Sequence, residues 1–422
     1  MKVTVTIIRL GQGVCPLTEE GIRTLLVIGL DVVSLADSAR RAGYRVYAVD
    51  YFGDQDLRRV CRESRSIVTQ RTGQTCGRLG KDFDPKVLLQ LTKDLLKRHT
   101  IDAALLSSGL EDCPDVLFEL NDLVPVLGSP LDVVEKVRGK IEFFQELRRI
   151  GIPYPETATA ENLEEARKKS KDIGYPVVVK PSRGFGGVGI RKARNPQELE
   201  QAFRDAFLLD EKVLIQEHIS GKPASTSMIS STKEAVTLTL NEQLLGVRGL
   251  GQGEPFGYCG NVVPLLTDKT VENRCKSIAG KIALHFRLAG SNGIDLVISK
   301  EGTPCVIEVN PRFQGTLECV ERVLGMNVVE AHVEACAQGT ILMLKKKPSV
   351  FCVRLILFAQ KRSVAPDLSV FEEVRDIPVP GVIVEEGEPI CSIVMEGANR
   401  DSLLRRARRK ANLIHKLLKP IY

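Results

Sequence analysis

Residues 293–315, read as GIDLVISKEGTPCVIEVNPRFQG, constrain the fold most, because they predict a β-hairpin with an acid inside each strand. Two apolar runs, Gly293–Ile298 and Pro304–Val309, have the length of strands. The segment between them, Ser299–Thr303, is rich in turn-forming residues. The rest of the chain must therefore supply a larger sheet that this hairpin joins.

The acids of this hairpin predict a metal site. Asp295 and Glu308 are thirteen residues apart, so pairing of the two strands places them nearly opposite each other. Asn310 follows Glu308 by two residues and shares its face of the strand. Two carboxylates and an amide oxygen suit Mg²⁺ that also holds phosphates. Two ordinary strands with a solvated polar face explain the same residues.

The length of 422 residues predicts two to four domains, and 43% apolar and 27% charged residues are typical of a soluble globular protein. The net charge of +6 is modest. The basic residues are scattered among acidic ones, and only the tail at 403–419 is locally basic, where apolar residues recur at helical spacing. A terminal amphipathic helix with a solvated basic face explains this tail better than a nucleic-acid surface, so we expect no nucleic-acid partner.

The eleven cysteines form no CxxC pair and no Cys/His metal pattern. Scattered through apolar segments, they indicate reduced, mostly buried thiols and a cytoplasmic protein. No apolar run reaches the roughly 20 residues of a membrane span, so we expect no membrane partner. Residues 1–23 precede the first clear strand and are expected to be a leader or an extra strand.

Residues 24–130 predict a Rossmann-like α/β domain with a parallel sheet. A buried strand at 24–29, a helix at 34–42 and a strand at 44–49 open it in β-α-β order. Asp50 could then bind a ribose hydroxyl, but the first turn lacks G-x-G-x-x-G, which disfavours dinucleotide binding.

Further elements of this domain are a helix at 85–99 and strands at 102–106 and 124–127. Glu111 and Asp112 follow the strand at 102–106, at the end of a parallel strand where α/β sheets bind ligands. Substrate contact is one interpretation of these acids, although solvated turn acids explain them more simply.

Residues 131–347 form the next expected domain. Apolar residues recur at helical spacing over 132–150, and the prolines of Gly151–Pro155 end that helix. A charged helix follows at 161–173. Residues 155–222 are expected to form a mobile lobe of this domain. The run 213–219 on its own predicts only an edge strand.

A strand with one lysine runs into a glycine-rich loop at 176–190, read as PVVVKPSRGFGGVGI. Glycines let successive amides turn toward an anion, so the loop predicts a phosphate site that includes Lys180. Gly-Lys-Ser/Thr is absent, and a second strand at 189–193 follows the loop. A flap over phosphates fits this order, while an ordinary glycine-rich hairpin explains the glycines but not the lysine.

Taken together, VVVKP with its glycine loop, LIQEHISG and IDLV…VIEVNPR resemble the ATP-grasp superfamily in order and approximate spacing. The resemblance covers about residues 24–400. It is nearest to the archaeal and methylotroph ATP-dependent carboligases, on the segments IGLDVVSLADSARRAGYRVYAVDYFGDQDL, FGYCGNVVPL and GEPICSIV. It implies an α+β ATP-grasp fold in two lobes behind the Rossmann-like domain, with a small β-rich region at 348–422 similar to that of biotin carboxylase-like members.

The resemblance also implies roles for individual residues. Lys140 and Lys180 would bind the nucleotide phosphates, Asp295, Glu308 and Asn310 would bind Mg²⁺, and Arg312 would face the transferred phosphoryl group. The backbone of Glu217 and Ile219 would read the adenine edge. The complete set of expected nucleotide contacts is Lys140, Lys180, Arg183, Gly184, Gly186, Gly187, Gln216, Glu217, His218 and Ile219.

Two positions depart from the pattern of the superfamily. Many relatives carry an acid after the hinge glycine for the ribose hydroxyls, whereas this chain has Lys222–Ser225, which leaves the ribose contact open. The first metal ligand is often Glu, and Asp295 is shorter.

The implied function is an ATP-dependent carboxylate-amine ligase that forms an acyl phosphate and releases ADP and phosphate. It would use ATP with one or two Mg²⁺ ions, which Mn²⁺ can replace, on small carboxylate and amine substrates, as a homodimer like many relatives. A carboxylase that activates bicarbonate and an ATP-binding sensor without catalysis are the alternatives. The chain has no Ala/Val-Met-Lys-Met tetrapeptide for biotin, so a carrier would be a separate protein.

The glycine-dense segment Gly249–Pro264 could line the acceptor pocket. Its Cys259 has no histidine nearby in sequence, so a buried thiol is expected rather than a nucleophile. His218 and His332 are each expected to be packing histidines rather than metal ligands.

Overall fold

The structure is a computed structural model, which describes residues 21–184, 186–341 and 348–421. The leader or extra strand expected at 1–23 thus lies outside the described residues except for 21–23, which form no strand. The helices are α1 Val33–Arg41, α2 Gln55–Val60, α3 Leu79–Asp82, α4 Pro85–Leu96, α5 Pro114–Leu123, α6 Leu131–Arg138, α7 Lys140–Arg149, α8 Leu163–Ile173, α9 Pro196–Phe207, α10 Lys269–Phe286, α11 Leu317–Leu324, α12 Val328–Gln338 and α13 Arg400–Leu417.

The strands are β1 Thr24–Ile28, β2 Arg45–Asp50, β3 Glu63–Ser66, β4 Ala103–Leu106, β5 Thr157–Ala160, β6 Val177–Pro181, β7 Arg191–Ala193, β8 Val213–Glu217, β9 Gly221–Ser230, β10 Ala235–Leu245, β11 Tyr258–Val263, β12 Gly290–Ser299, β13 Pro304–Asn310, β14 Phe351–Phe358, β15 Ser363–Val364, β16 Val374–Arg375, β17 Ile383–Val384, β18 Pro389–Gly397 and β19 Lys419–Pro420. Mixed helix and strand of this kind confirm the predicted α+β class.

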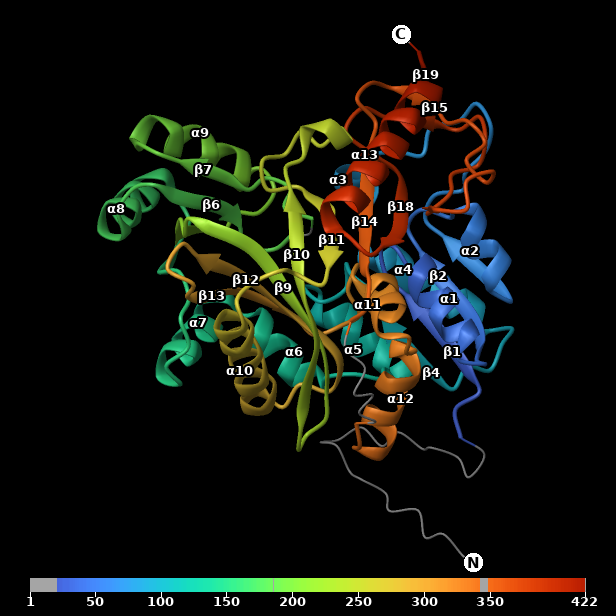
Figure 1. Ribbon diagram of the computed structural model, residues 1–422, viewed down its shortest axis with the longest axis horizontal. Coiled ribbons are helices and arrows are strands. Elements are labelled where there is room, and N and C mark those ends of the chain that lie inside the picture. The colour runs from blue at the N-terminus through green and yellow to red at the C-terminus, as the bar shows by residue number, and fades with distance from the viewer. Residues whose placement is uncertain (1–20, 185, 342–347, 422) are drawn as a thin grey trace, which may run out of the picture.

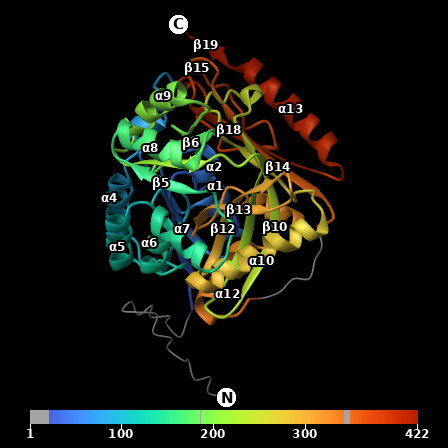
Figure 2. The same ribbon diagram turned by 90° about the vertical axis from the view of Figure 1, so that its left-hand side faces the viewer.

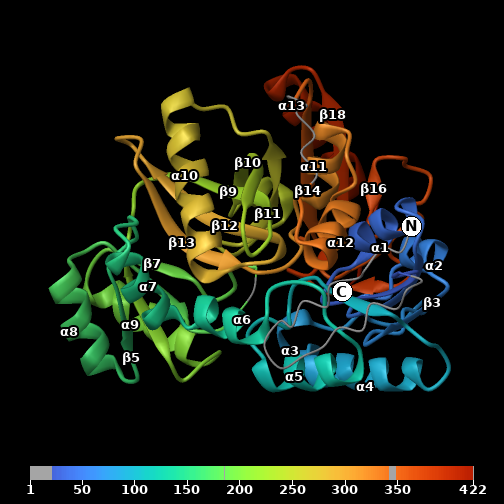
Figure 3. The ribbon, with the colours of Figure 1, turned by 90° about the horizontal axis from the view of Figure 1, so that it is seen from below.

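The N-terminal sheet has the order β3-β2-β1-β4 with every pair parallel, as the β-α-β opening predicted. Alternate residues of its strands enter two cores, because side chains of a strand point to opposite faces. Leu25 and Val27 pack toward α1, α11 and α12, while Leu26 and Ile28 pack toward α4 and α5. Figure 3 shows α4 and α5 along the face of this sheet that is turned away from α1.

The second sheet, β5-β8-β6-β7, carries α8 and α9 and projects as a separate green lobe in Figure 1. Its strands span residues 157–217, within the expected lobe. β8 lies inside the sheet between β5 and β6, so the prediction of an edge strand was wrong. The apolar run VLI is buried on both sides, which suits an inner position.

The largest sheet has eight strands in the order β13-β12-β9-β10-β11-β14-β18-β16. The expected C-terminal strands β14 and β18 continue this sheet through the pairing of β11 with β14. α10 covers one of its faces (Figure 3), and α13 lies along the outer edge of the molecule in Figure 2. α13 buries Leu403, Leu404, Ala407, Ala411 and Ile414, as expected of an amphipathic helix.

Two expected elements differ. The single helix predicted over 132–150 is two helices, because Gly139 leaves the helical conformation with φ −67° and ψ 91°. A glycine costs about 1 kcal/mol in a helix, which makes it a natural break. The strand predicted at 124–127 is one bridge between Ala104 and Val126 in the described structure. Pro125 has no N–H to extend a ladder.

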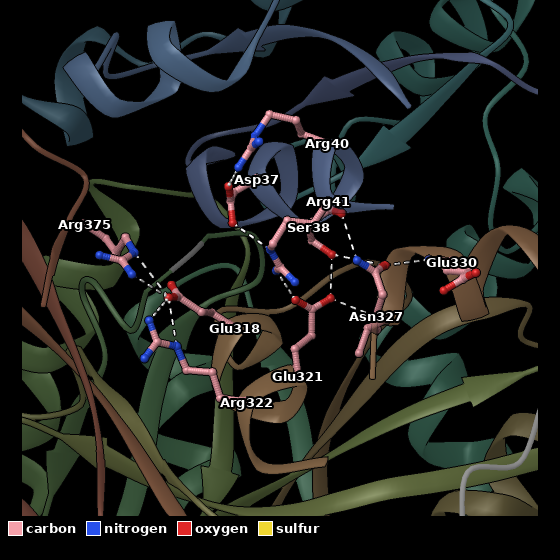
Figure 4. A network of polar contacts seen from close by, with 11 residues as sticks. Asp37, Ser38, Arg40, Arg41, Glu318, Glu321, Arg322, Asn327, Glu330 and Arg375 are labelled. Atoms are coloured by element: carbon pink, nitrogen blue, oxygen red, sulfur yellow. Dashed lines mark hydrogen bonds and ion pairs between the residues drawn. The ribbon is translucent and has the colours of Figure 1, made fainter. Parts of the chain in front are cut away.

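Charged side chains join α1 to α11 and α12 (Figure 4). Glu321, which is 4% exposed, accepts hydrogen bonds from Ser38 Oγ at 2.5 Å and from the Val328 amide at 2.8 Å, and it pairs with Arg41. Nearby, Glu318 accepts from Arg322 at 2.7 Å. The contacts of Glu321 with α1 hold the N-terminal domain against the helices that follow the predicted metal hairpin.

Among the described residues, every helix is too short or too polar to cross a membrane. The cysteines of the same part of the chain are free, and most are buried, as predicted.

Candidate functional site

The predicted hairpin is β12 and β13, and Asp295 is the direct partner of Glu308 in its register. A bulge follows Asp295. Asn310 Nδ2 donates to Asp295 Oδ2 at 3.2 Å, and Gln243 Nε2 of β10 donates to Asp295 Oδ1 at 2.9 Å. The three predicted metal ligands therefore lie together, with Gln243 as a further neighbour that the sequence did not indicate.

The two acids of the hairpin have different protonation preferences. Burial, followed by the charge of Glu308, raises the pKa of Asp295 to about 7. Burial would also raise the pKa of Glu308, but Lys140 and Arg138 outweigh it and hold that pKa well below its usual range. Glu308 is thus a carboxylate at neutral pH that cations surround.

Lys140 and Lys180 reach this hairpin from different elements. Lys140 Nζ, at the start of α7, lies 2.9 Å from Glu308 Oε2. Lys180 of β6 is 7% exposed and donates to Gln216 Oε1 at 3.0 Å. Burial, and then the charge of Lys140, lowers the pKa of Lys180 to about 7, whereas Glu308 opposes that shift. Lys180, from the lobe of residues 157–217, therefore lies close enough to Lys140 and to Glu308 of the hairpin for their charges to interact.

The glycine loop between β6 and β7 is anchored at its first residues. Ser182 Oγ and the Arg183 amide both donate to Asp210 Oδ2, at 2.6 and 3.0 Å. Gly186 and Gly187 have φ of +64° and +79°, a region that side chains rarely adopt. Gly184, next to the anchored Arg183, is exposed. The antiparallel pairing of β6 with β7 confirms that the loop joins two strands.

The predicted hinge lies at the end of β8. The Gln216 side chain is engaged by Lys180 and donates to Thr157 Oγ1 at 2.8 Å. The Glu217 amide donates to the Glu156 carbonyl at 2.8 Å, so this amide is already paired within the lobe. Ile219 follows the strand and is part-buried.

The two histidines differ. His218 Nδ1 is buried and has no hydrogen-bond partner among the described residues, so His218 is not a satisfied packing histidine. His332 is a packing histidine with both ring nitrogens engaged. Its Nδ1 accepts from the Ser291 amide at 2.7 Å, and its Nε2 lies 3.2 Å from the Leu127 carbonyl. A buried nitrogen beside the hinge fits a site that a polar ligand completes.

Glu111 and Asp112 are not the solvated turn acids that seemed the simpler interpretation. Glu111 is 8% exposed and accepts from Arg312 Nε at 2.6 Å. Asp112 accepts two hydrogen bonds from Arg138, at 2.6 and 2.7 Å. Arg312 also donates to Asn310 Oδ1 at 3.2 Å. The acids of the N-terminal domain therefore orient two arginines of the site instead of being free to contact a substrate.

Arg354 of β14 was not predicted from the sequence. It is 3% exposed and lies 2.7 Å from both Asp31 Oδ2 and Asp376 Oδ2. Such a pair of carboxylates orients the guanidinium and joins the N-terminal domain to the last strands. An isolated arginine within an apolar strand, FCVRLILF, is the one signal that pointed to it.

Two alternatives from the sequence lose support. Asp50 is 1% exposed and accepts from Ser66 Oγ at 2.5 Å and from the Gly53 amide at 3.0 Å, so it braces a turn and is not placed for a ribose. Cys259 is fully buried, and burial raises the pKa of its thiol, which agrees with a packing role.

In the part of the chain that the structure describes, no three His, Cys, Asp or Glu side chains gather as a metal site. The predicted donor set instead has two carboxylates and the amide of Asn310, whose Oδ1 accepts from Arg312 in this arrangement. Hard oxygen donors of this kind, with the buried Lys180 and the part-buried Lys140 beside them, fit a divalent cation that carries phosphates.

Comparison with known proteins agrees with this geometry. Residues 137–316 match a family described as the ATP-grasp domain. An uncharacterised protein of Methanocaldococcus jannaschii is 26% identical over 375 residues, which cover 87% of each chain.

Among solved structures, the biotin carboxylase of Campylobacter jejuni in complex with β,γ-ATP has a TM-score of 0.72 at 18% identity, over 94% of this chain and 91% of that chain. The L-amino acid ligase of Bacillus licheniformis has a TM-score of 0.68 at 16% identity, over 95% and 98%. At these identities the likeness shows the fold. Residues 137–316 are thus an ATP-grasp domain by this match, and the chain as a whole has the fold of these two solved structures.

Proposed function

We propose that this protein is an ATP-dependent carboxylate-amine ligase. The observation that carries the proposal is the convergence of Lys180 and Lys140 on the acids Glu308 and Asp295. ATP and a carboxylate repel each other, so a site that joins them must supply positive charge at the phosphates. Lys140 and Lys180, held on separate lobes, supply that charge from two sides.

Asp295, Glu308 and Asn310 would hold Mg²⁺. The ion would neutralise phosphate charge and orient the terminal phosphate. Lys180 would bind a phosphate oxygen, which would favour its protonated form despite burial. Arg312, oriented by Glu111, would bind the phosphoryl group as it moves to the carboxylate of the first substrate. The glycines 184, 186 and 187, with Arg183, would cover the phosphates and exclude water.

The product of that first step is an acyl phosphate, with ADP as the leaving group. An amine would then attack the acyl carbon and release phosphate, which forms a C–N bond. The adenine would lie at Gln216–Ile219, with His218 Nδ1 as a further polar contact. No protein nucleophile is needed, and the burial of Cys259 agrees with that.

A phosphate-release assay with Mg²⁺, ATP and a panel of carboxylates and amines tests the proposal. Release that requires one acid and one amine supports the ligase. Release with bicarbonate alone identifies a carboxylase, and tight ATP binding without release for any substrate identifies a sensor. Either of the last two results contradicts the ligase.

A further inference from the structure

The glycine loop, here residues 182–190, lies against a second loop at residues 251–258. We call this second loop the 251–258 loop. It belongs to the glycine-dense segment whose role the sequence left open. The Tyr258 amide donates to the Gly186 carbonyl at 2.9 Å. Glu254 accepts from the Gly189 amide at 3.3 Å and from Arg191 Nη2 at 3.1 Å, and it pairs with Arg191 Nη1 as well.

The contact is close because glycine leaves room for it. A Cβ atom at Gly187 would lie 2.0 Å from the Phe256 carbonyl oxygen. Any side chain at position 187 would therefore push the two loops apart. The backbones of the two loops are in direct contact here, and among the described residues the charged pair between them is Arg191 with Glu254.

Hydrogen bonds of its own, separate from the contact with the glycine loop, hold the shape of the 251–258 loop. The Gly246 amide donates to the Gly257 carbonyl at 2.8 Å, and the Gly257 amide donates to the Glu254 carbonyl at 3.0 Å. The Glu254 amide donates to Gln252 Oε1 at 2.9 Å, and Gln252 is 9% exposed. These hydrogen bonds thus fix the position of the Glu254 backbone.

Contacts of Tyr258, at the end of the 251–258 loop, continue toward the hairpin of β12 and β13. Asn261 Nδ2 donates to Tyr258 Oη at 2.7 Å, and Asn261 is the direct partner of Gln243 in the pairing of β10 with β11. Gln243 in turn holds Asp295 at 2.9 Å. A single run of contacts therefore connects the glycine loop with the proposed metal ligands.

We propose that Glu254 is a positioning residue, which fixes the glycine loop over the phosphates through Arg191 and the Gly189 amide. The proposal rests on the function proposed above, because the loop needs a fixed position only if it covers the phosphates of bound ATP. In this role Glu254 acts on the loop and not on the reacting atoms. It acts through the backbone of the glycine loop.

Hydrogen exchange of the ligand-free full-length protein tests the proposal without any substrate. Glu254→Gln and Arg191→Gln should each speed exchange of the amides at 186–189 about fivefold, because a charge-assisted contact is lost at a part-exposed site. The exchanged pair Arg191→Glu with Glu254→Arg should recover most of the protection. Glu200→Gln, which removes the Arg167 and Arg204 contacts of the same lobe, should leave these amides unchanged.

A second measurement separates positioning from a structural role. The melting temperature of Glu254→Gln should equal that of the wild type, while its KM for ATP rises severalfold and kcat falls less. Equal exchange at 186–189 in wild type, Glu254→Gln and Arg191→Gln would overturn the proposal. Failure of the wild type to bind Mg²⁺-ATP would overturn the function instead, since the exchange test needs no nucleotide.

Discussion

The ammonium nitrogen of Lys140 lies 2.9 Å from Oε2 of Glu308, and the break at Gly139 places it there. In one continuous helix, Lys140 would take a different direction. Because the chain breaks at Gly139, α7 begins at Lys140, and the side chain of Lys140 points to β13. A single glycine thereby connects the helical pair α6 and α7 to the charges of the candidate site.

Glu308→Gln should abolish turnover and keep the fold. The amide retains the shape of the side chain but removes the negative charge that a divalent cation needs, so we expect at least about a hundredfold loss of kcat. Phosphate release, with circular dichroism as the check on folding, measures both effects. Glu301→Gln, at the exposed turn of the same hairpin, is the matched control. Wild-type rates in Glu308→Gln would show that the metal assignment is wrong.

Lys180→Met should weaken Mg²⁺-ATP binding by about tenfold or more while the melting temperature does not fall. The reason is that burial lowers the pKa of Lys180 to about 7, so the charged lysine costs stability in the absence of phosphate. Calorimetric titration and thermal unfolding measure the two effects. Lys171→Met, on the exposed side of α8, should change neither. A loss of stability together with normal ATP affinity would make Lys180 a structural residue.

Glu111→Gln should lower the free energy of unfolding by about 3 kcal/mol, because it leaves the charge of Arg312 buried without its partner. Urea unfolding measures this change. Glu119→Gln removes an exposed pair with Lys93 and should cost less than about 1 kcal/mol. If the two variants are equally stable, the pair with Arg312 does not hold the N-terminal domain on the site.

His332 should make the protein less stable in acid. Burial lowers its pKa to about 4, whereas an unfolded histidine titrates near about 6.5. Between these values the unfolded chain binds the proton and the folded chain does not, so stability falls as the pH drops from 6.5 to 4. The loss approaches about 3 kcal/mol.

Urea unfolding of wild type and His332→Gln across pH 4 to 7.5 measures this effect. The curve of the wild type should be steeper below pH 6.5, and the two curves should run parallel above pH 7. Parallel curves over the whole range would show that His332 does not titrate differently on folding.

Local sequence patterns predicted much of the fold. The alternation of apolar residues and turns located β12 and β13, and it also placed Asp295 opposite Glu308, because hairpin register follows from turn position. The lysine before the glycines likewise located β6 and its loop. These features depend on neighbours in the chain, which a sequence displays directly.

Contacts between distant segments could not be predicted in the same way. Glu111 looked like a turn acid, because nothing near it in sequence indicates that Arg312, 201 positions away, reaches it. Arg354 pairs with Asp31 from 323 positions away. The break at Gly139 was missed for another reason: the apolar spacing continues across it, so periodicity alone favoured one helix.

Titration of the wild-type protein with ATP, with and without Mg²⁺, beside the same titrations of Glu308→Gln, tests the central claim most directly. We predict that the wild type binds ATP more tightly with Mg²⁺ by at least about tenfold, and that Glu308→Gln loses this difference. Equal Mg²⁺ dependence in the two proteins, or no ATP binding by the wild type, would contradict the account.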